Sequence, residues 1–181
     1  MIWVCRAGVY SSYLEYFFQN NKVFLPWRNS YRKDLSAFKS LEDMKSFVRN
    51  ENNGASNTSI ATWTSQLRIF SCDMKIADYV LIPHSHSRQF TLAEIAGDYC
   101  FSENDPMKLW HSRKITILPG EILRSSLSKP LQYSLGAYRT VFRIKQEEEL
   151  LEVYNKALNQ MGCLASGYEP DCTIRKLPQK D

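Results

Sequence analysis

Residues 79–95 begin with the run Tyr79-Val80-Leu81-Ile82, continue through the polar stretch His84-Ser85-His86-Ser87-Arg88 and end with the run from Phe90 to Ile95. The two outer runs are rich in β-branched and aromatic residues, which suit a pleated, half-buried surface. The stretch between them is short and polar, as a turn between two strands usually is. The pattern therefore predicts a β-hairpin, or two adjacent antiparallel strands, over residues 79–95.

Four shorter runs on either side of this hairpin also have the composition of strands. Pro26 directly follows the second run and has no N–H to donate, so that strand should end there or lie at an edge of the sheet. Pro119-Gly120 should stop the third run. The predicted strands cover residues 2–6, 23–25, 114–118 and 140–144.

The clearest helix is predicted over residues 58–71. Its apolar side chains recur at spacings of 3, 4 and 3, and so share one face: Ile60, Trp63, Leu67 and Phe70. Ser40 followed by acids predicts the start of another helix, because serine accepts N–H bonds and acids suit the positive end of the helix dipole. The predicted helices besides 58–71 are 12–19, capped by Ser11 or Ser12, then 41–49, short helices within 121–135, and an amphipathic helix over 146–161.

These elements predict an α+β fold, with a small curved or barrel-like mixed β-sheet and helices packed on it. A chain of 181 residues suits one domain with a sizeable core. We expect a body over residues 1–144, followed over 145–181 by the amphipathic helix and a mobile tail. The helix suits docking on the body or on a partner, including a second copy of the chain in a homodimer.

The composition, with 44% hydrophobic and 23% charged residues, is that of a globular protein. We expect a cytoplasmic protein with no membrane partner, because no apolar run is long enough for a signal peptide or a membrane span. Five cysteines without a CxxC pair favour reduced thiols over disulfides or zinc. Residues 1–144 hold 18 Lys and Arg against 12 Asp and Glu, while 145–181 hold 5 against 7. The basic body is compatible with phosphate binding.

The sequence offers little for catalysis. It contains no nucleophile elbow, zinc-protease motif, P-loop or glycine-rich dinucleotide motif. The histidines His84, His86 and His111 come without a third ligand at a recognisable spacing. The dense acidic run over 147–152 opens a predicted helix, where it compensates the dipole. We therefore expect a protein that is not an enzyme and needs no cofactor or metal.

A series of short motifs resembles the N-terminal domain of predicted Mrr-type restriction endonucleases, over about residues 2–144. Two departures stand out, because Pro26 and Ala77 occupy positions where that pattern has glycine. The stretch from Trp63 to Glu94 also resembles the EVE and YTH branches of the PUA superfamily. The motifs are Trp3-Val4-Cys5-Arg6-Ala7-Gly8, Val23-Phe24-Leu25-Pro26-Trp27, Met74-Lys75-Ile76-Ala77-Asp78-Tyr79-Val80, Gly97-Asp98-Tyr99, Leu135-Gly136 and Thr140-Val141-Phe142-Arg143-Ile144.

The resemblance implies a PUA/EVE/YTH-like fold and a domain that reads nucleic acid, often a modified base. Such a base is read after it leaves the stack, by aromatic stacking and by hydrogen bonds to its Watson–Crick edge. Trp27 matches the position of a cage tryptophan in the YTH domains. The residues expected at a base or nucleic-acid site are Trp27, Arg28, Trp63, Ser65, Gln66, Pro83, His84, Arg88, Trp110 and Arg6.

Plainer roles stay open for several of these residues. Trp27 and Trp63 also suit core packing, and Ser65 and Gln66 also suit an exposed helix face. Arg6 would face either a phosphate or a buried acid such as Asp98. We expect Arg113 to be one of the cations, in loops or at strand ends, that track a nucleic-acid backbone.

The expected partners are nucleic acid, with DNA favoured over RNA, and an effector nuclease in the same or another chain. The nuclease half of the Mrr-type architecture is not recognised in these 181 residues. Two alternatives stay open: an RNA-binding domain like the YTH domains, and a protein-interaction module that does not bind nucleic acid.

Overall fold

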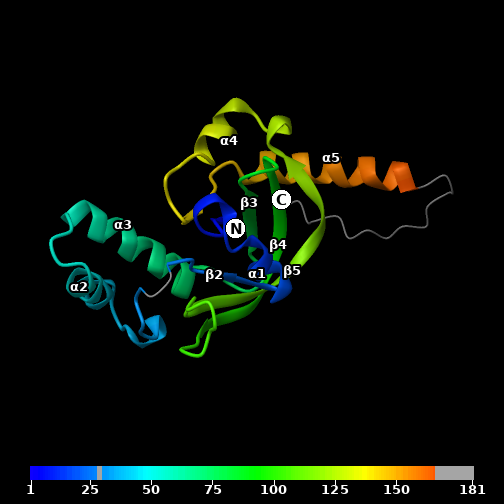
Figure 1. Ribbon diagram of the computed structural model, residues 1–181. Coiled ribbons are helices and arrows are strands. Elements are labelled where there is room, and N and C mark those ends of the chain that lie inside the picture. The colour runs from blue at the N-terminus through cyan, green and yellow to red at the C-terminus, as the bar shows by residue number, and fades with distance from the viewer. Residues whose placement is uncertain (28–29, 166–181) are drawn as a thin grey trace.

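A six-stranded mixed sheet lies at the centre of the computed structural model, which describes residues 1–27 and 30–165 (Figure 1). The strands are β1 (Ile2–Cys5), β2 (Lys22–Phe24), β3 (Tyr79–His84), β4 (Gln89–Phe101), β5 (His111–Leu123) and β6 (Val141–Arg143). Their order is β2-β5-β4-β3-β1-β6, with β1 parallel to β3 and every other pair antiparallel. The α+β class is confirmed. The barrel-like closure is wrong, because the edge strands β2 and β6 do not pair in the described residues.

The helices lie in separate groups around the sheet. Figure 1 shows α2 and α3 side by side at the left of the sheet, while α5 extends from it at the upper right. None of the helices in the described ranges combines the length and apolar character of a membrane span. The α-helices are α1 (Leu14–Gln19), α2 (Leu41–Glu51), α3 (Asn57–Arg68), α4 (Lys129–Ser134) and α5 (Glu147–Ala165), with short 3-10 turns η1 (Val9–Ser11), η2 (Leu35–Ala37) and η4 (Arg124–Ser126) and a π turn η3 (Ile69–Asp73).

The predicted hairpin over 79–95 is confirmed as β3 and β4, whose last pair is His84 with Gln89. The prediction that Pro119 stops its strand is wrong, since β5 continues to Leu123. Two features allow it to continue. Pairing with β2 ends at Lys114, so a missing N–H at Pro119 costs no bond to that neighbour. The β4–β5 register also shifts near Thr91, and Gly120 there adopts a φ of 82° that suits glycine.

Two apolar cores cover the two faces of the sheet. All four residues of β1 are buried, because successive side chains enter opposite cores. Trp3 and Cys5 belong to the core that includes residues of α1, α2 and α3, while Ile2 and Val4 belong to the core that includes residues of α4 and α5. Helix α5 docks on the body, because Tyr154 is buried in the second core and its hydroxyl donates to the carbonyl oxygen of Pro119 at 2.8 Å.

The two predicted serine caps have different outcomes. Ser40 caps α2 as predicted, with its Oγ accepting a hydrogen bond from the N–H of Asp43 at 3.1 Å. The cap predicted at Ser11 or Ser12 is wrong, because Tyr13 precedes α1 and makes no side-chain cap. Ser11 instead donates to the carbonyl oxygen of Pro83 at 3.1 Å and accepts from the N–H of Ser85 at 2.9 Å. It therefore holds the β3–β4 turn.

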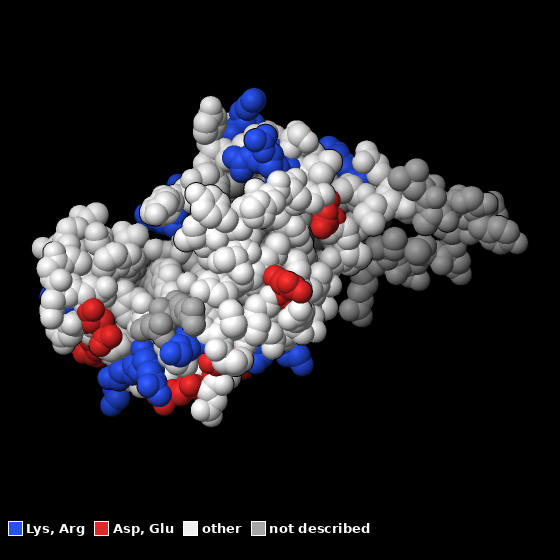
Figure 2. Space-filling model, viewed as in Figure 1, with Lys and Arg blue, Asp and Glu red and all other residues white. Residues whose placement is uncertain are grey.

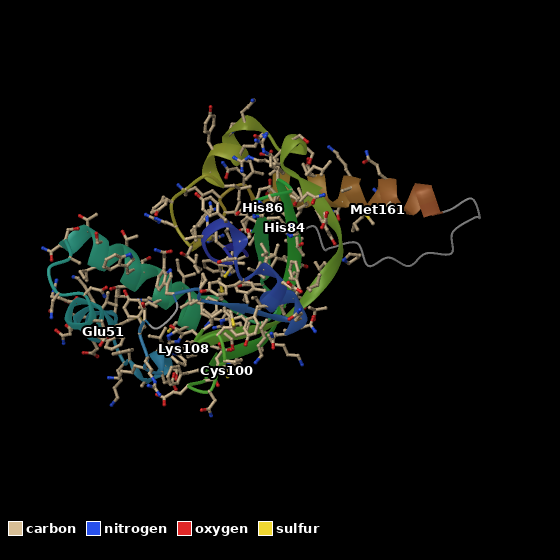
Figure 3. All side chains as sticks on the ribbon, in the orientation of Figure 1. Glu51, His84, His86, Cys100, Lys108 and Met161 are labelled. Atoms are coloured by element: carbon tan, nitrogen blue, oxygen red, sulfur yellow. The ribbon has the colours of Figure 1, made fainter. Side chains whose placement is uncertain are left out.

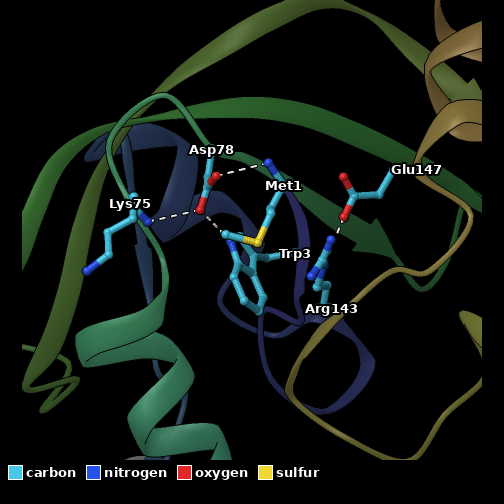
Figure 4. A network of polar contacts seen from close by, with 6 residues as sticks. All are labelled: Met1, Trp3, Lys75, Asp78, Arg143 and Glu147. Carbon is cyan, nitrogen blue, oxygen red and sulfur yellow. Dashed lines mark hydrogen bonds and ion pairs between the residues drawn. The ribbon is translucent and has the colours of Figure 1, made fainter. Parts of the chain in front are cut away.

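Asp78 joins the start of β3 to β1 (Figure 4). Its carboxylate accepts hydrogen bonds from Nε1 of Trp3 at 2.8 Å, from the N–H of Lys75 at 3.0 Å, and from the amino group of Met1 at 3.0 Å. Burial alone would raise the pKa of Asp78, but these hydrogen bonds and the charge of the amino group lower it overall. The same turn contains Ala77 with a φ of 69°.

Replacing Ala77 with glycine should raise the free energy of unfolding by about 0.5–1 kcal/mol. A left-handed conformation costs an L-residue about 1–2 kcal/mol, and glycine avoids this strain. The greater freedom of glycine in the unfolded chain offsets roughly 0.5–1 kcal/mol of that gain. Urea denaturation of Ala77→Gly measures the change. Ala61→Gly, on the exposed face of α3, is the matched control and should lose stability. A similar loss for both variants would contradict the account.

His111 forms a buried hydrogen-bonded link between two tyrosines. Its Nε2 lies 2.9 Å from the carbonyl oxygen of Tyr31, and a carbonyl only accepts, so Nε2 carries the proton. Nδ1 then accepts from the hydroxyl of Tyr99 at 2.7 Å, and that hydroxyl accepts from the N–H of Leu35 at 3.1 Å. Burial lowers the pKa of His111 to about 4. The link therefore suits the neutral imidazole.

Acid should destabilise the fold through His111. Its folded pKa lies below the unfolded value of about 6.5, so its contribution is complete above that pH and is lost as the pH falls toward 4. We expect the free energy of unfolding to be about 2 kcal/mol lower at about pH 5 than at about pH 8. Urea denaturation at both pH values tests this, and NMR titration of the imidazole assigns the effect. A pKa near 6.5 for His111 would contradict it.

Candidate functional site

A pocket of about 300 Å³ opens where the turn of the β3–β4 hairpin meets three other segments. These are the residue after β1, the η4 turn after β5 and the residue after α4. The pocket gathers four residues that the sequence proposed for a nucleic-acid site, Arg6, Pro83, His84 and Arg88, from segments far apart in the chain. Its lining residues are Arg6, Pro83, His84, Ser85, Arg88, Gln89, Phe90, Arg124 and Leu135.

The guanidinium of Arg6 is held by backbone carbonyl groups after α4. Its NH2 donates to the oxygens of Leu135 at 2.6 Å and Ala137 at 3.1 Å, and its Nε donates to that of Arg139 at 2.9 Å. Burial, followed by the nearby charge of Arg124, lowers the pKa of Arg6. The suggested pairing with Asp98 is wrong, since that residue is exposed on β4. Arg6 thus presents a fixed positive charge to the pocket.

Arg88 and Arg124 supply the other two charges. The N–H of Arg124 donates to the carbonyl oxygen of Arg88 at 2.9 Å, which ties η4 to the hairpin turn. The NH2 of Arg124 donates to the carbonyl oxygen of Gln132 at 3.0 Å. Across the described ranges, neither of these arginines nor Arg6 forms an ion pair with a carboxylate. Figure 2 shows Lys and Arg side chains clustered at the top of the view, in the region where Figure 1 labels α4.

His84 lies at the wall of this pocket, near the tip of the hairpin and well away from Glu51 on α2 (Figure 3). Its Nε2 is 2.8 Å from Oγ1 of Thr91, and its ring centre is 5.8 Å from that of Phe18. Burial lowers the pKa of His84 against the opposite effect of Glu121. The side chain is therefore suited to act as a neutral hydrogen-bonding group. Among the side chains that the structure describes, no group of three His, Cys, Asp or Glu is placed to hold a metal ion.

A second set of predicted residues meets at Thr140, just before β6. Nε1 of Trp27 donates to Oγ1 of Thr140 at 3.1 Å, and the half-buried indole lies 5.7 Å from the ring of Tyr31. Oε1 of Gln66 accepts from the N–H groups of Thr140 at 2.7 Å and Val141 at 3.1 Å. Gln66 is buried, so its exposed alternative is wrong. Both the indole of Trp27 and the amide of Gln66 therefore fix the start of β6.

The arginine-lined pocket and the residues that meet at Thr140 are connected through the backbone. The N–H of Arg6 donates to the carbonyl oxygen of Thr140 at 2.9 Å. The segment from Leu135 to Thr140 thus lies between the arginine-lined pocket and the side chain of Trp27. Trp27 is not one of the residues that line this pocket.

The remaining predicted residues lie elsewhere. Trp63 is half buried against the first core, and Ser65 is exposed on α3. Trp110 is 7% exposed, and its buried Nε1 has no partner among the described atoms. The guanidinium of Arg32 lies 5.4 Å from the centre of the Trp110 ring. Arg28 lies outside the described residues, as does the predicted tail from residue 166 onward.

Arg113 does not track a surface as the sequence suggested. It is 3% exposed, and its Nε and NH2 donate to the carbonyl oxygens of Phe70 at 2.7 Å and Ser71 at 3.0 Å. Conversely, Arg124 lines the pocket and was not singled out in the sequence. The sequence predicts short helices around Arg124, and only the charge of its side chain distinguishes it in that stretch.

A family model described as "Domain of unknown function (DUF8426)" matches residues 5–123. No curated protein matches the chain. The NMR structure of Rpa0253 from Rhodopseudomonas palustris is similar with a TM-score of 0.40 and 14% identity, over 94% of this chain and 99% of that one. The crystal structure of Atu2648 from Agrobacterium tumefaciens has a TM-score of 0.36 and 15% identity, over the same shares. Both are distant similarities.

Proposed function

We propose that this chain, which belongs to the family described as "Domain of unknown function (DUF8426)", is a non-catalytic reader domain that binds DNA through its arginine-lined pocket. One observation carries the proposal. Arg6, Arg88 and Arg124 line one pocket, and none of them is neutralised by a carboxylate in the described part of the chain. Phosphate groups are among the anions that match the geometry of a guanidinium.

The other lining groups add hydrogen-bonding capacity. Ser85, Gln89 and His84 offer donors and acceptors beside the arginines. His84 offers its Nδ1, because its Nε2 already lies 2.8 Å from Oγ1 of Thr91. Phosphate contacts position a nucleic acid, while contacts to base edges give selectivity. We therefore assign the arginines to positioning and these polar side chains to selectivity.

The resemblance to the Mrr-type N-terminal domain and to the EVE and YTH branches extends the proposal. In this extension Trp27 stacks on a modified, flipped-out base, and an effector nuclease in the same or another chain acts on the DNA. The half-buried position of the Trp27 indole, one backbone segment away from the pocket, supports this arrangement. We place the reader unit in residues 1–144 and assign contacts with a partner to 145–181.

DNA affinity should fall about tenfold in Arg124→Gln, with a shallower dependence on salt. Each lost phosphate contact reduces the slope of log affinity against log salt by about one, whatever the DNA sequence. Fluorescence anisotropy with short duplexes at about 50 and 200 mM salt measures both quantities. Arg49→Gln removes one charge from the exposed face of α2 and should bind as the wild type does. Equal losses in both variants would contradict a role for the pocket.

A panel of duplexes with different base modifications tests the extension. Trp27→Ala should weaken binding of the preferred modified duplex more than binding of unmodified DNA, because stacking contributes about 1–3 kcal/mol per base. Tighter binding of the matching RNA would favour the alternative RNA reader, which would use the 2′-hydroxyl. If modified, unmodified and single-stranded DNA and RNA all fail to bind at low salt, the reader function is wrong.

A further inference from the structure

The shape of the arginine-lined pocket limits which phosphate it can accept. Its walls come from four segments: the residue after β1, the hairpin turn, η4 and the residue after α4. The pocket is half open rather than enclosed, so its size limits the ligand more than its walls do. A pocket of about 300 Å³ is at the small end of those that hold single small molecules. This volume suits one phosphate that carries a single nucleoside.

The charge of the pocket also favours a phosphate monoester. Arg6 already donates three hydrogen bonds to backbone carbonyls. The guanidinium of Arg124 donates one such bond, and that of Arg88 donates none among the described residues. No carboxylate lines the pocket. A phosphate monoester carries close to two negative charges at neutral pH, whereas a phosphodiester carries one. Two available arginines therefore match a monoester.

The backbone of Arg88 is held in a costly conformation. Its φ is 54°, in the left-handed region that favours glycine over a long side chain. The hydrogen bond from Arg124 and the Ser11 contacts with the turn hold the backbone there. Strain of this kind often accompanies a functional position. A glycine would relax the turn, so stability alone does not explain an arginine at this position.

The lining also contains apolar groups. Pro83, Phe90 and Leu135 share the pocket with the arginines. Inorganic phosphate has no group that gains from apolar contacts, while a sugar or a base does. The lining thus suits a phosphate that carries a nucleoside.

From these observations we infer that the pocket binds the phosphate monoester of a nucleotide, either at the end of a nucleic-acid strand or on a free mononucleotide. The inference rests on the proposed function, because it specifies the ligand of the same pocket. It adds that the chain distinguishes phosphorylated ends or nucleotides from a continuous strand.

Calorimetric titration of the full chain tests this inference with five probes. They are an oligonucleotide with a terminal phosphate, the same oligonucleotide with terminal hydroxyls, deoxyadenosine monophosphate, deoxyadenosine and inorganic phosphate. We expect each phosphorylated probe to bind about tenfold tighter than its unphosphorylated counterpart, since a charge-assisted contact is worth about one order of magnitude. Inorganic phosphate should bind more weakly than the nucleotide. Preference for the oligonucleotide over the mononucleotide identifies a strand end as the source, and the reverse identifies a free nucleotide.

Arg88→Gly is the informative variant, because it removes the charge and relaxes the turn. It should lose the preference for phosphorylated probes while its melting temperature stays the same or rises. Arg49→Gln is the matched control and should keep the preference. A melting temperature that falls together with binding would overturn the inference, as would an equal loss of preference in the control.

The outcomes separate this inference from the proposed function. If strands bind equally well with and without a terminal phosphate, the inference is overturned and DNA binding stands. If the mononucleotide binds but no strand does, the inference stands and the reader function is overturned. Binding of inorganic phosphate as tight as that of the nucleotide overturns the assignment of a nucleotide.

Discussion

Replacing Asp78 with alanine should lower the free energy of unfolding by about 3 kcal/mol, because the Nε1 of buried Trp3 and the N–H of Lys75 lose their acceptor (Figure 4). The buried indole N–H of Trp3 left without a partner costs about 1–3 kcal/mol. The N–H of exposed Lys75 adds less, because water can replace the carboxylate. Loss of the contact with the amino group of Met1 adds to this. Urea denaturation measures the difference.

Two controls define the source of this loss. Asp78→Asn keeps one oxygen acceptor without the charge, so it should lose about half as much stability. Asp73→Ala removes an exposed carboxylate paired with Arg68 at 3.4 Å and should change stability by less than about 0.5 kcal/mol. Equal effects of Asp78→Ala and Asp73→Ala would show that the contacts of Asp78 do not hold β1 to β3.

Replacing Gln66 with leucine should cost about 2–3 kcal/mol of stability. The substitution leaves the N–H groups of Thr140 and Val141 without the oxygen that now accepts both. The damage should also reach the pocket, because the carbonyl of Thr140 accepts from the N–H of Arg6. We therefore expect weaker DNA binding as well as a lower melting temperature.

Gln66→Glu is the matched variant, since it retains oxygen acceptors for both N–H groups. It should be more stable than Gln66→Leu and should bind DNA more tightly. If the leucine variant is as stable as the wild type, Gln66 does not hold the start of β6. A stable leucine variant with impaired binding would instead place the side chain at the ligand.

Local patterns in the sequence predicted most of the elements. The hairpin over 79–95 and the helix over 58–71 follow from periodicity, which directly reflects which face of an element is buried. The path of β5 could not be predicted in this way. Pro119-Gly120 has the composition of a stop, and only the end of β2 pairing at Lys114 and the adjacent bulge allow the strand to continue.

The candidate site was only partly predictable for the same reason. The resemblance and the predicted positions of strands and loops singled out Arg6, Pro83, His84 and Arg88, which the fold brings to one pocket. Arg124 reaches that pocket through the long β5 strand, so it depends on the path that local patterns missed. The buried clamp made by Gln66 was also hidden, because spacing on a helix reveals a face but does not identify the backbone groups opposite it.

The NMR response of the arginine Nε–Hε signals to added DNA tests whether the arginine-lined pocket of the full chain is the nucleic-acid site. We expect the signals of Arg6, Arg88 and Arg124 to shift in proportion to occupancy and to return when salt is raised, while that of Arg49 stays unchanged. Binding of DNA with shifts confined to other arginines would contradict the assignment of the pocket as the nucleic-acid site.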